Sequence, residues 1–226
     1  LRACPRGCFP SDTRRPCPVV PGFGIDRPDV AVAGVVQSFR PDGAILQAGR
    51  PVPLANAFVA NGSRTVLYFR DVEFARLGGP IVLHPLLRFA ANSSFTAACA
   101  HAQFGIEATV IPPLIQPRSY RTETLRSHVL FINPVREKGL DIALELAEMN
   151  PRIPFLFQEA WPLSDASLAA LESRLQTLPN VTLKRAKRAL KSVYSRAKVV
   201  LVPSLRQGAW GRIVTEAHFS GITVLA

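Results

Sequence analysis

The stretch HVLFINPVREKGLDIALELAEMNPRIPFLFQE (128–159) decides the fold, because an apolar run is followed by an amphipathic segment and then by a second apolar run. The two apolar runs have the length and composition of buried parallel strands, and the segment between them predicts a helix. The pattern continues, with helices expected over 164–179, 188–197 and 211–221 and strands over 180–184, 198–204 and 222–226. Regular alternation of this kind predicts a doubly wound parallel sheet.

The first half of the chain predicts a second α/β region. Apolar runs at 30–36 (VAVAGVV) and 65–69 (TVLYF) predict two buried strands, and the alanine-rich segment between them predicts a helix. A short strand and a helix are expected over 90–105, with Asn92 or Ser93 as the N-cap residue. The predicted fold class is therefore α/β, with two Rossmann-like, doubly wound parallel-sheet domains, the first of them incomplete.

Composition divides the chain into three parts. Residues 1–28, rich in Pro, Arg and Cys, predict an irregular arm. Residues 29–120 and 121–226 are the two predicted domains. Both look incomplete at their outer ends, so we expect the chain to be a piece of a longer protein.

The net charge limits the classes of possible binding partner but does not select one of them. Lys and Arg outnumber Asp and Glu by 27 to 16, a formal charge of +11 that attracts phosphates. Nucleic acid, anionic membranes and nucleotide-linked substrates all qualify, but only 184–198 is a dense basic cluster. The four Cys and four His lack the spacing of a metal site, so no bound metal is predicted. With no long apolar run and no signal-peptide pattern, a soluble intracellular protein is expected.

Two segments that follow predicted strands are candidates for a ligand site, because open α/β sheets bind ligands beyond the carboxyl ends of their strands. In NPVREKG (133–139), Arg136 and Lys138 come at the start of a helix whose free amides favour an anion; the alternative is a polar helix start with Lys138 in solvent. In SLRQGAWGRIVTEA (204–217), glycines allow the backbone to pass close to a ligand. Glu216 in this segment is either a buried carboxylate that binds sugar hydroxyls or a surface residue.

The last segment, PSLRQGAWGRIVTEAHFSGITVLA (203–226), resembles the E-x7-E region of glycosyltransferase family 4, a group of retaining enzymes with the GT-B fold. Other segments resemble this family in the same order along the chain. They are PDVAVAG (28–34) and TVLYFRDVEF (65–74) of the acceptor domain, NSSFTAACAHAQFGIEATVIPPLI (92–115) of the linking segment, and FINPVREKGLDIALELAEMNPRIPFLF (131–157), LPNVTL (178–183) and SVYSRAKVVLVPS (192–204) of the donor domain. The resemblance implies a GT-B enzyme truncated at both ends, with a partial acceptor-side domain over 29–120 and a nucleotide-sugar donor domain over 121–226 that lacks its end.

The resemblance also implies roles for individual residues. Lys138 matches the lysine that grips the donor diphosphate, Glu216 matches the glutamate that binds the ribose, and Arg136 either replaces the family's phosphate-binding arginine or does not. These three residues are the predicted catalytic set. The predicted donor-binding set is Asn133, Gly139, Gly208, Trp210, Gly211 and Arg212. Gly208 departs from the family, because it stands where the first glutamate of E-x7-E normally contacts the donor sugar.

The implied function is transfer of a sugar from a nucleoside diphosphate sugar to an acceptor hydroxyl, with retention and without a metal; the chain contains no D-x-D triplet. No cofactor is expected besides this donor, and the acceptor is a carbohydrate, a lipid-linked molecule or another small molecule. Two alternatives stay open: a noncatalytic GT-B relative that acts as a binding or partner subunit, and a basic nucleic-acid-binding module that uses 184–198. The favoured prediction is a carbohydrate-biosynthetic enzyme of the cytoplasm that binds no nucleic acid, with peripheral contact at the inner membrane face left open.

Overall fold

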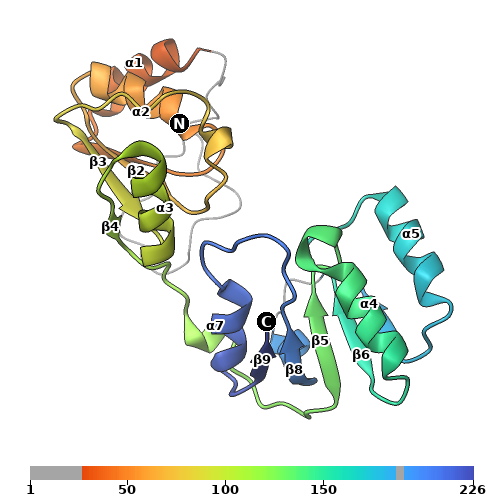
Figure 1. The fold of residues 1–226 in the computed structure, drawn as a ribbon. Helices are drawn as coiled ribbons and strands as arrows, with labels where there is room; N and C mark the ends of the chain where they lie inside the picture. Colours follow the sequence, from red (N-terminus) through yellow and green to blue (C-terminus); the bar gives the residue numbers. More distant parts are fainter. Residues whose placement is uncertain (1–26, 187–190) are drawn as a thin grey trace. The chain divides into compact units, whose positions relative to one another are not determined.

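The computed structural model of the protein describes residues 27–186 and 191–226, which form two compact α/β units (Figure 1). Within these residues, the first unit contains 27–69, Glu73–Ala90 and Ile106–Thr109, and the second contains Arg70–Val72, Ala91–Gly105 and Val110–Ala226. Each unit is made of several segments that are separate in the chain. The predicted domain ranges 29–120 and 121–226 are therefore not tested by this division and stay predictions. The predicted arm at 1–28 lies almost wholly outside the described residues.

The first sheet has four strands in the order β1-β2-β3-β4, which is also their order along the chain. The elements of this half of the chain are α1 (Pro28–Phe39), β1 (Gly43–Leu46), α2 (Pro51–Ala60), β2 (Arg64–Phe69), η1 (Phe74–Leu77), β3 (Leu87–Ala91), α3 (Ser94–Phe104) and β4 (Thr109–Val110). β1 and β2 pair in parallel. The strand predicted at 65–69 and the helix predicted before it are confirmed, and Ser93 caps α3 by accepting a hydrogen bond from the amide of Thr96.

The strand predicted at 30–36 is wrong, because these residues belong to helix α1. Val32 is fully buried in a cluster with Ala57 and Phe58 of α2, and the valines one turn further along α1 pack against the same cluster. Contacts three and four residues apart are helical contacts, and here they outweigh the strand preference of a β-branched run. The first strand is instead β1 (Gly43–Leu46), which the sequence analysis did not predict.

The second sheet has five strands in the order β7-β6-β5-β8-β9, and all of its strand pairs are parallel. Its elements follow a short turn, η2 (Pro117–Ser119), and are β5 (His128–Ile132), η3 (Arg136–Lys138), α4 (Leu140–Met149), β6 (Phe155–Gln158), α5 (Asp165–Leu175), β7 (Val181–Lys184), α6 (Lys191–Tyr194), β8 (Ala197–Leu201), α7 (Arg212–His218) and β9 (Thr223–Leu225). Every strand predicted in this half is present, and the order reverses between β5 and β8. The predicted doubly wound sheet is thus confirmed.

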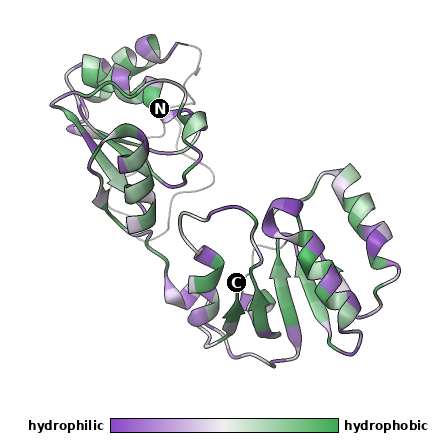
Figure 2. Ribbon diagram, in the orientation of Figure 1, coloured by the Kyte–Doolittle hydropathy of each residue, from purple (hydrophilic) through white to green (hydrophobic). Residues whose placement is uncertain are grey.

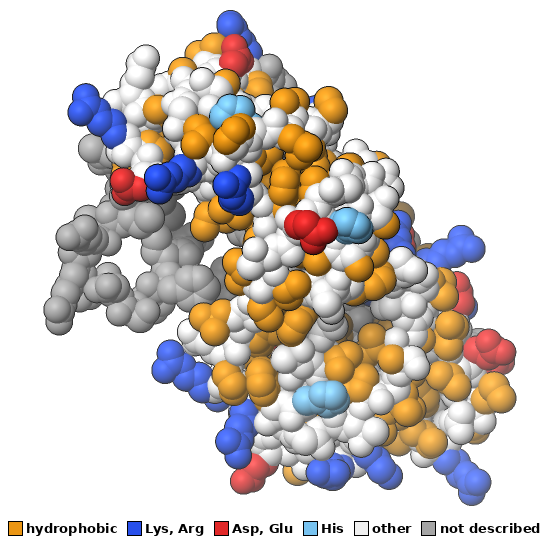
Figure 3. All heavy atoms as spheres, turned by 60° about the vertical axis from the view of Figure 1, so that its left-hand side comes forward, with side chains coloured by type: hydrophobic (Ala, Val, Ile, Leu, Met, Phe, Trp, Pro, Cys, Tyr) orange, Lys and Arg blue, Asp and Glu red, His pale blue; other side chains and the backbone are white. Residues whose placement is uncertain are grey.

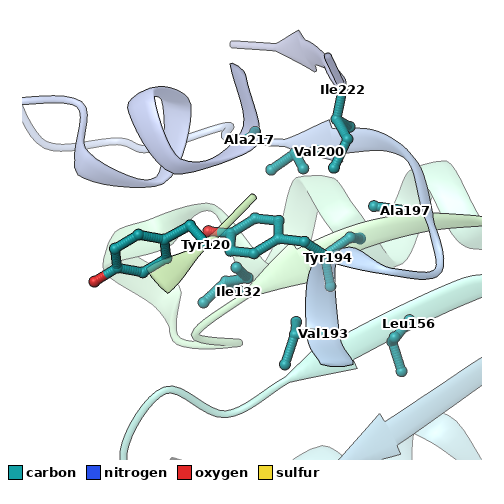
Figure 4. Close-up of a cluster of buried hydrophobic side chains, with 10 residues drawn as sticks. Tyr120, Ile132, Leu156, Val193, Tyr194, Ala197, Val200, Ala217 and Ile222 are labelled. Carbon is teal, nitrogen blue, oxygen red and sulfur yellow. The ribbon is translucent and has the colours of Figure 1, made fainter. Parts of the chain in front are cut away.

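Among the described residues of the second unit, two apolar clusters are built from the alternating side chains of β5, β6 and β8. One cluster lies against α4 and contains Phe131, Phe155 and Phe157. The other contains Leu130, Val200 and Ile222 together with residues of α6 and α7, and is drawn in Figure 4. The strands are hydrophobic over most of their length while the connecting segments are more polar (Figure 2). A sheet that is apolar on both faces presents its polar residues at the strand ends, where a ligand site is expected.

Candidate functional site

The point where the strand order of the second sheet reverses lies between β5 and β8. These strands pair in parallel register, with Leu130 opposite Val200 and Phe131 opposite Leu201, so their carboxyl ends lie side by side. The chain leaves β5 toward α4 and leaves β8 toward α7. Ligands of doubly wound sheets bind at such a reversal. The two segments predicted as candidates, 133–139 and 204–217, are the segments that leave these two strand ends.

Direct contacts join these two segments. The amide of Leu205 donates a hydrogen bond to the carbonyl oxygen of Glu137 at 3.2 Å. Gly139 has a φ of +82°, and a Cβ atom at this position would lie 2.0 Å from the carbonyl oxygen of Pro203. Only a residue without a side chain allows the turn after β5 to approach the segment after β8 this closely. Gly139 is therefore required for the packing of the two segments, whatever ligand lies beside them.

Arg136 and Lys138 lie in a 3-10 turn and not in the first turn of a helix, which corrects the prediction. Helix α4 begins only at Leu140, after Gly139. The amides of Lys138 and Leu140 donate to the carbonyl oxygen of Val135, and that of Gly139 donates to Arg136, so these three amides are not free for an anion. The Arg136 side chain is exposed and that of Lys138 half-buried. Within the described part of the chain, neither side chain has an ion-pair partner, so their positive charges are available to a ligand.

Asn133 is buried and connects the ends of two strands. It lies directly after β5 with a φ of +63°, a left-handed conformation that Asn tolerates better than most residues. Its side-chain Oδ1 accepts a hydrogen bond from the amide of Ala160 at 3.1 Å, just beyond β6. The structure therefore gives this predicted donor-binding residue a structural role in holding the loops after β5 and β6 together.

Neither glycine predicted to allow a close backbone turn after β8 has a left-handed conformation. Gly211 has a φ of −73°, and Gly208 is not one of the glycines whose φ is positive. A Cβ atom on Gly208 would meet nothing within 4 Å, whereas one on Gly211 would touch the side chain of Val214 at 3.3 Å. Gly208 is exposed, so a longer side chain fits there. The neighbouring Trp210 buries its indole Nε1 without a hydrogen-bond partner among the described residues.

Glu216 is buried, with 4% of its surface exposed, so the alternative of a surface glutamate is wrong. Its carboxylate already has protein partners: Oε2 accepts from the Tyr194 hydroxyl at 2.8 Å, and Oε1 accepts from Nε of Arg212 at 2.7 Å. Arg212 also donates from Nη2 to the hydroxyl oxygen of Tyr120 at 2.6 Å. A carboxylate has about four acceptor positions, so two bonds leave room for ligand hydroxyls.

Charge and burial shift two pKa values in this network. Burial, followed by the charge of Glu216 and the hydrogen bond to it, raises the pKa of Tyr194 far above its ordinary value, so its hydroxyl remains a donor. The hydrogen bonds to Glu216 and to Tyr120 raise the pKa of Arg212. These bonds therefore favour the charged form of the guanidinium.

Sequence reasoning missed Tyr194 as a partner of Glu216 and Tyr120 as a partner of Arg212, and it also missed Glu159. Glu159 follows β6 directly and is 1% exposed; it accepts a hydrogen bond from the amide of Ala186 at 3.0 Å and pairs with Arg185 at 3.2 Å. A signal for Glu159 was present, because a carboxylate after an apolar strand lies on the same sheet edge as the site. No comparable signal existed for the two tyrosines, which reach Glu216 and Arg212 from other parts of the chain.

Within 27–186 and 191–226, no group of three or more His, Cys, Asp and Glu side chains is arranged to hold a metal ion. None of the helices in these ranges is both long and apolar enough to span a bilayer.

The fold resembles solved structures of glycosyltransferases. HepE of Anabaena in complex with UDP and glucose aligns with a TM-score of 0.70 and 16% identity over 87% of this chain and 62% of its own. A glycosyltransferase from Rickettsia africae aligns with a TM-score of 0.69 and 11% identity over 96% and 64%. WaaG, a glycosyltransferase of lipopolysaccharide biosynthesis, aligns with a TM-score of 0.61 and 13% identity over 86% and 62%.

These likenesses are structural. No protein-family model matches the chain, and no curated protein matches it by sequence. The chain spans about 62% of the length of the HepE structure. At these identities the likeness shows the fold. The two α/β units of this chain, with a four-stranded and a five-stranded sheet, therefore have the GT-B architecture of glycosyltransferases, over part of the length of the proteins they resemble.

Proposed function

We propose that this chain belongs to a glycosyltransferase that binds a nucleoside diphosphate sugar at the carboxyl ends of β5 and β8. The observation that carries the proposal is the contact of Gly139 with Pro203, which joins the two strand-end segments at the reversal of the sheet. The segment after β5 brings two cations without ion-pair partners among the described residues, and the segment after β8 leads to the buried Glu216. A diphosphate and the hydroxyls of a ribose or sugar require these two kinds of group.

Six of the predicted residues have a proposed role at the donor. Lys138 and Arg136 neutralise the diphosphate, and Glu216 accepts hydrogen bonds from the ribose hydroxyls. The support is the unpaired charge of the two cations within the described chain and the burial of Glu216, because a buried carboxylate with acceptor positions to spare binds hydroxyls strongly. Trp210, Gly211 and Arg212 border the donor sugar; the unbonded indole nitrogen of Trp210 supports this role.

The proposed reaction is transfer of the sugar with retention at its anomeric carbon. The bond between that carbon and the diphosphate oxygen breaks, a bond to the acceptor oxygen forms on the same face, and the acceptor proton leaves with the nucleoside diphosphate. Negative charge grows on the departing diphosphate, and fixed cations stabilise it more in the transition state than in the bound substrate. Lys138 and Arg136 supply this stabilisation, and we propose that no metal ion takes part.

The comparisons support the choice of donor. The HepE structures contain UDP, UDP-glucose, or UDP and glucose, and this chain shares their fold. We therefore propose a nucleotide sugar as donor, a carbohydrate, lipid-linked or small-molecule acceptor, and membership of glycosyltransferase family 4. We also place the enzyme in the cytoplasm, with peripheral contact at the inner membrane face favoured by its net charge of +11.

The nucleic-acid alternative is not favoured. Tyr194, the aromatic residue within the basic cluster 184–198, is fully buried and so cannot stack on a base. Arg185 of the same cluster is paired with Glu159, and residues 187–190 of the cluster lie outside the described residues. On the face drawn in Figure 3, the coloured Lys and Arg side chains are scattered among apolar and uncharged ones and do not form one patch.

Calorimetric titration with UDP, GDP and ADP tests the proposal. The wild-type chain should bind at least one of them, and Lys138→Ala should weaken that binding by about tenfold or more, since a charge-assisted contact contributes about 1.5–3 kcal/mol. The matched control is Lys198→Ala, which removes the same charge from an exposed position at the amino end of β8, opposite the site. Binding that is equally weakened in both variants would mean that only net charge matters, and unchanged binding in Lys138→Ala would exclude the proposed phosphate contact.

A further inference from the structure

Four side chains of the second unit form a continuous network of hydrogen bonds through Glu216. Tyr194 and Arg212 donate to its two carboxylate oxygens, and Arg212 donates in turn to the hydroxyl of Tyr120. The guanidinium carbon of Arg212 also lies 6.0 Å from the centre of the Tyr120 ring. The proposed function uses Glu216 and Arg212, but it gives no role to either tyrosine.

Tyr194 carries a polar hydroxyl group on a ring that is buried among apolar side chains. The Tyr194 ring is fully buried in the apolar cluster beside Ile132 and Val200, and the Tyr120 ring lies next to it (Figure 4). Phenylalanine would fill the same space without a polar atom, and burying a hydroxyl is unfavourable unless it is hydrogen-bonded. What the hydroxyl adds to this cluster is therefore its bond to Glu216, which restricts the carboxylate to one orientation.

Tyr120 restricts the other end of the network. Its position is itself well held, because Ser220 after α7 donates to the Tyr120 carbonyl oxygen at 3.4 Å and accepts from the amide of Thr122 at 3.0 Å. The Arg212 side chain is 61% exposed and would otherwise be free to move. Two of its five N–H donors are used by Glu216 and Tyr120, so the guanidinium is fixed while further donors remain for an anionic or hydroxyl-bearing ligand.

We propose that Tyr194 and Tyr120 are positioning residues for the nucleotide-sugar site. Tyr194 orients the carboxylate of Glu216, and Tyr120 orients the guanidinium of Arg212, before the ligand arrives. A long side chain that is already held in its binding orientation loses less rotamer entropy when the ligand binds, so affinity rises without any tyrosine–ligand contact. This inference rests on the proposed function, because it assigns the two tyrosines to that site.

The test compares single hydroxyl deletions in the full chain. Calorimetric titration with UDP should give a dissociation constant about two- to tenfold higher for Tyr194→Phe and for Tyr120→Phe than for the wild type, because the side chain that each tyrosine orients must then be ordered when the ligand binds. Tyr68→Phe is the matched control, because Tyr68 lies on β2 in the first unit and outside the network. It should bind UDP with wild-type affinity.

A second arm separates positioning from a purely structural role. If Tyr194 acts through Glu216, then Tyr194→Phe should have no further effect on UDP affinity once Glu216→Ala has removed the acceptor. A structural tyrosine would weaken binding by the same factor in both backgrounds. Thermal unfolding without nucleotide confirms that each variant is folded at the titration temperature. Tyr120→Phe, which changes the more exposed end of the network, carries the test should Tyr194→Phe fail to fold.

The outcomes are distinguishable. A wild-type chain that binds none of UDP, GDP and ADP overturns the proposed function and this inference with it. A wild type that binds, with both Tyr→Phe variants binding equally well, overturns the inference alone. An equal loss of affinity in the Glu216→Ala background also overturns it, because the hydroxyl of Tyr194 then acts independently of Glu216.

Discussion

Replacing Gly139 by alanine should separate the two segments of the candidate site. The added Cβ would lie 2.0 Å from the carbonyl oxygen of Pro203 and 2.8 Å from its carbonyl carbon. Close carbon–oxygen contacts in proteins are about 3.3 Å long, so one segment has to move by more than about 1 Å. The left-handed backbone costs an alanine about 1–2 kcal/mol, and relieving the overlap costs about 1–3 kcal/mol more.

The free energy of unfolding should therefore fall by about 2–5 kcal/mol, a loss of roughly 4–20 °C in melting temperature for a chain of this size. Urea unfolding followed by circular dichroism measures the change, and calorimetric titration with UDP measures the effect on the site. Binding should weaken more than stability alone explains, because the displaced segment carries Lys138.

Gly221→Ala is the matched control for this change. Gly221 has a similar left-handed φ of +60°, but a Cβ there would meet nothing within 4 Å. This variant should lose only the backbone contribution of about 1–2 kcal/mol and should keep its affinity for UDP. Equal stability and equal UDP affinity in the two alanine variants would refute the argument that contact between Gly139 and Pro203 holds the site together.

Three further predictions concern single side chains. Gly208→Glu should leave the melting temperature unchanged, because a side chain fits there, and should raise donor hydrolysis or transfer; no gain in either rate would favour a noncatalytic relative. Glu216→Gln should lower the free energy of unfolding in urea by about 1–3 kcal/mol, because the buried hydroxyl of Tyr194 and the guanidinium of Arg212 lose a charged acceptor; an unchanged urea midpoint would contradict this. Burial, and then two nearby cations, lower the pKa of His128 below its ordinary 6.5, so its neutral form is favoured on folding. Its stabilising contribution is then complete above pH 6.5 and is lost as the pH falls, and urea midpoints at pH 7.5 and 5.5 should differ less in His128→Asn than in the wild type.

A strand-like composition alone did not determine the conformation of an apolar run. The β-branched runs at 30–36 and 198–204 look alike in composition, yet the first is helical and the second contains β8. The second run lies between two amphipathic segments whose period is clear. The first has no such context, and its conformation depends on burial of Val32 against Ala57 and Phe58, which lie about 25 residues further along the chain.

In the candidate site, too, some features were predicted from the sequence and others depend on the tertiary structure. The strand-end rule located both segments, and the structure joins them through Gly139 and Pro203. The rule could not say that the amides after Val135 are already used within their own turn, because that depends on where α4 begins. The roles of the individual site residues stay predictions until ligand binding is measured.

Local periodicity and the geometry of parallel strands were enough to predict the two α/β regions, the parallel sheet of the second and the two segments at its reversal. Tertiary structure alone decided which atoms meet. Glu216 accepts one hydrogen bond from Tyr194, 22 residues away, and through Arg212 it is connected to Tyr120, which is 92 residues from that arginine. Contacts over such separations depend on how the helices pack on the sheet, and no local pattern in the chain encodes them.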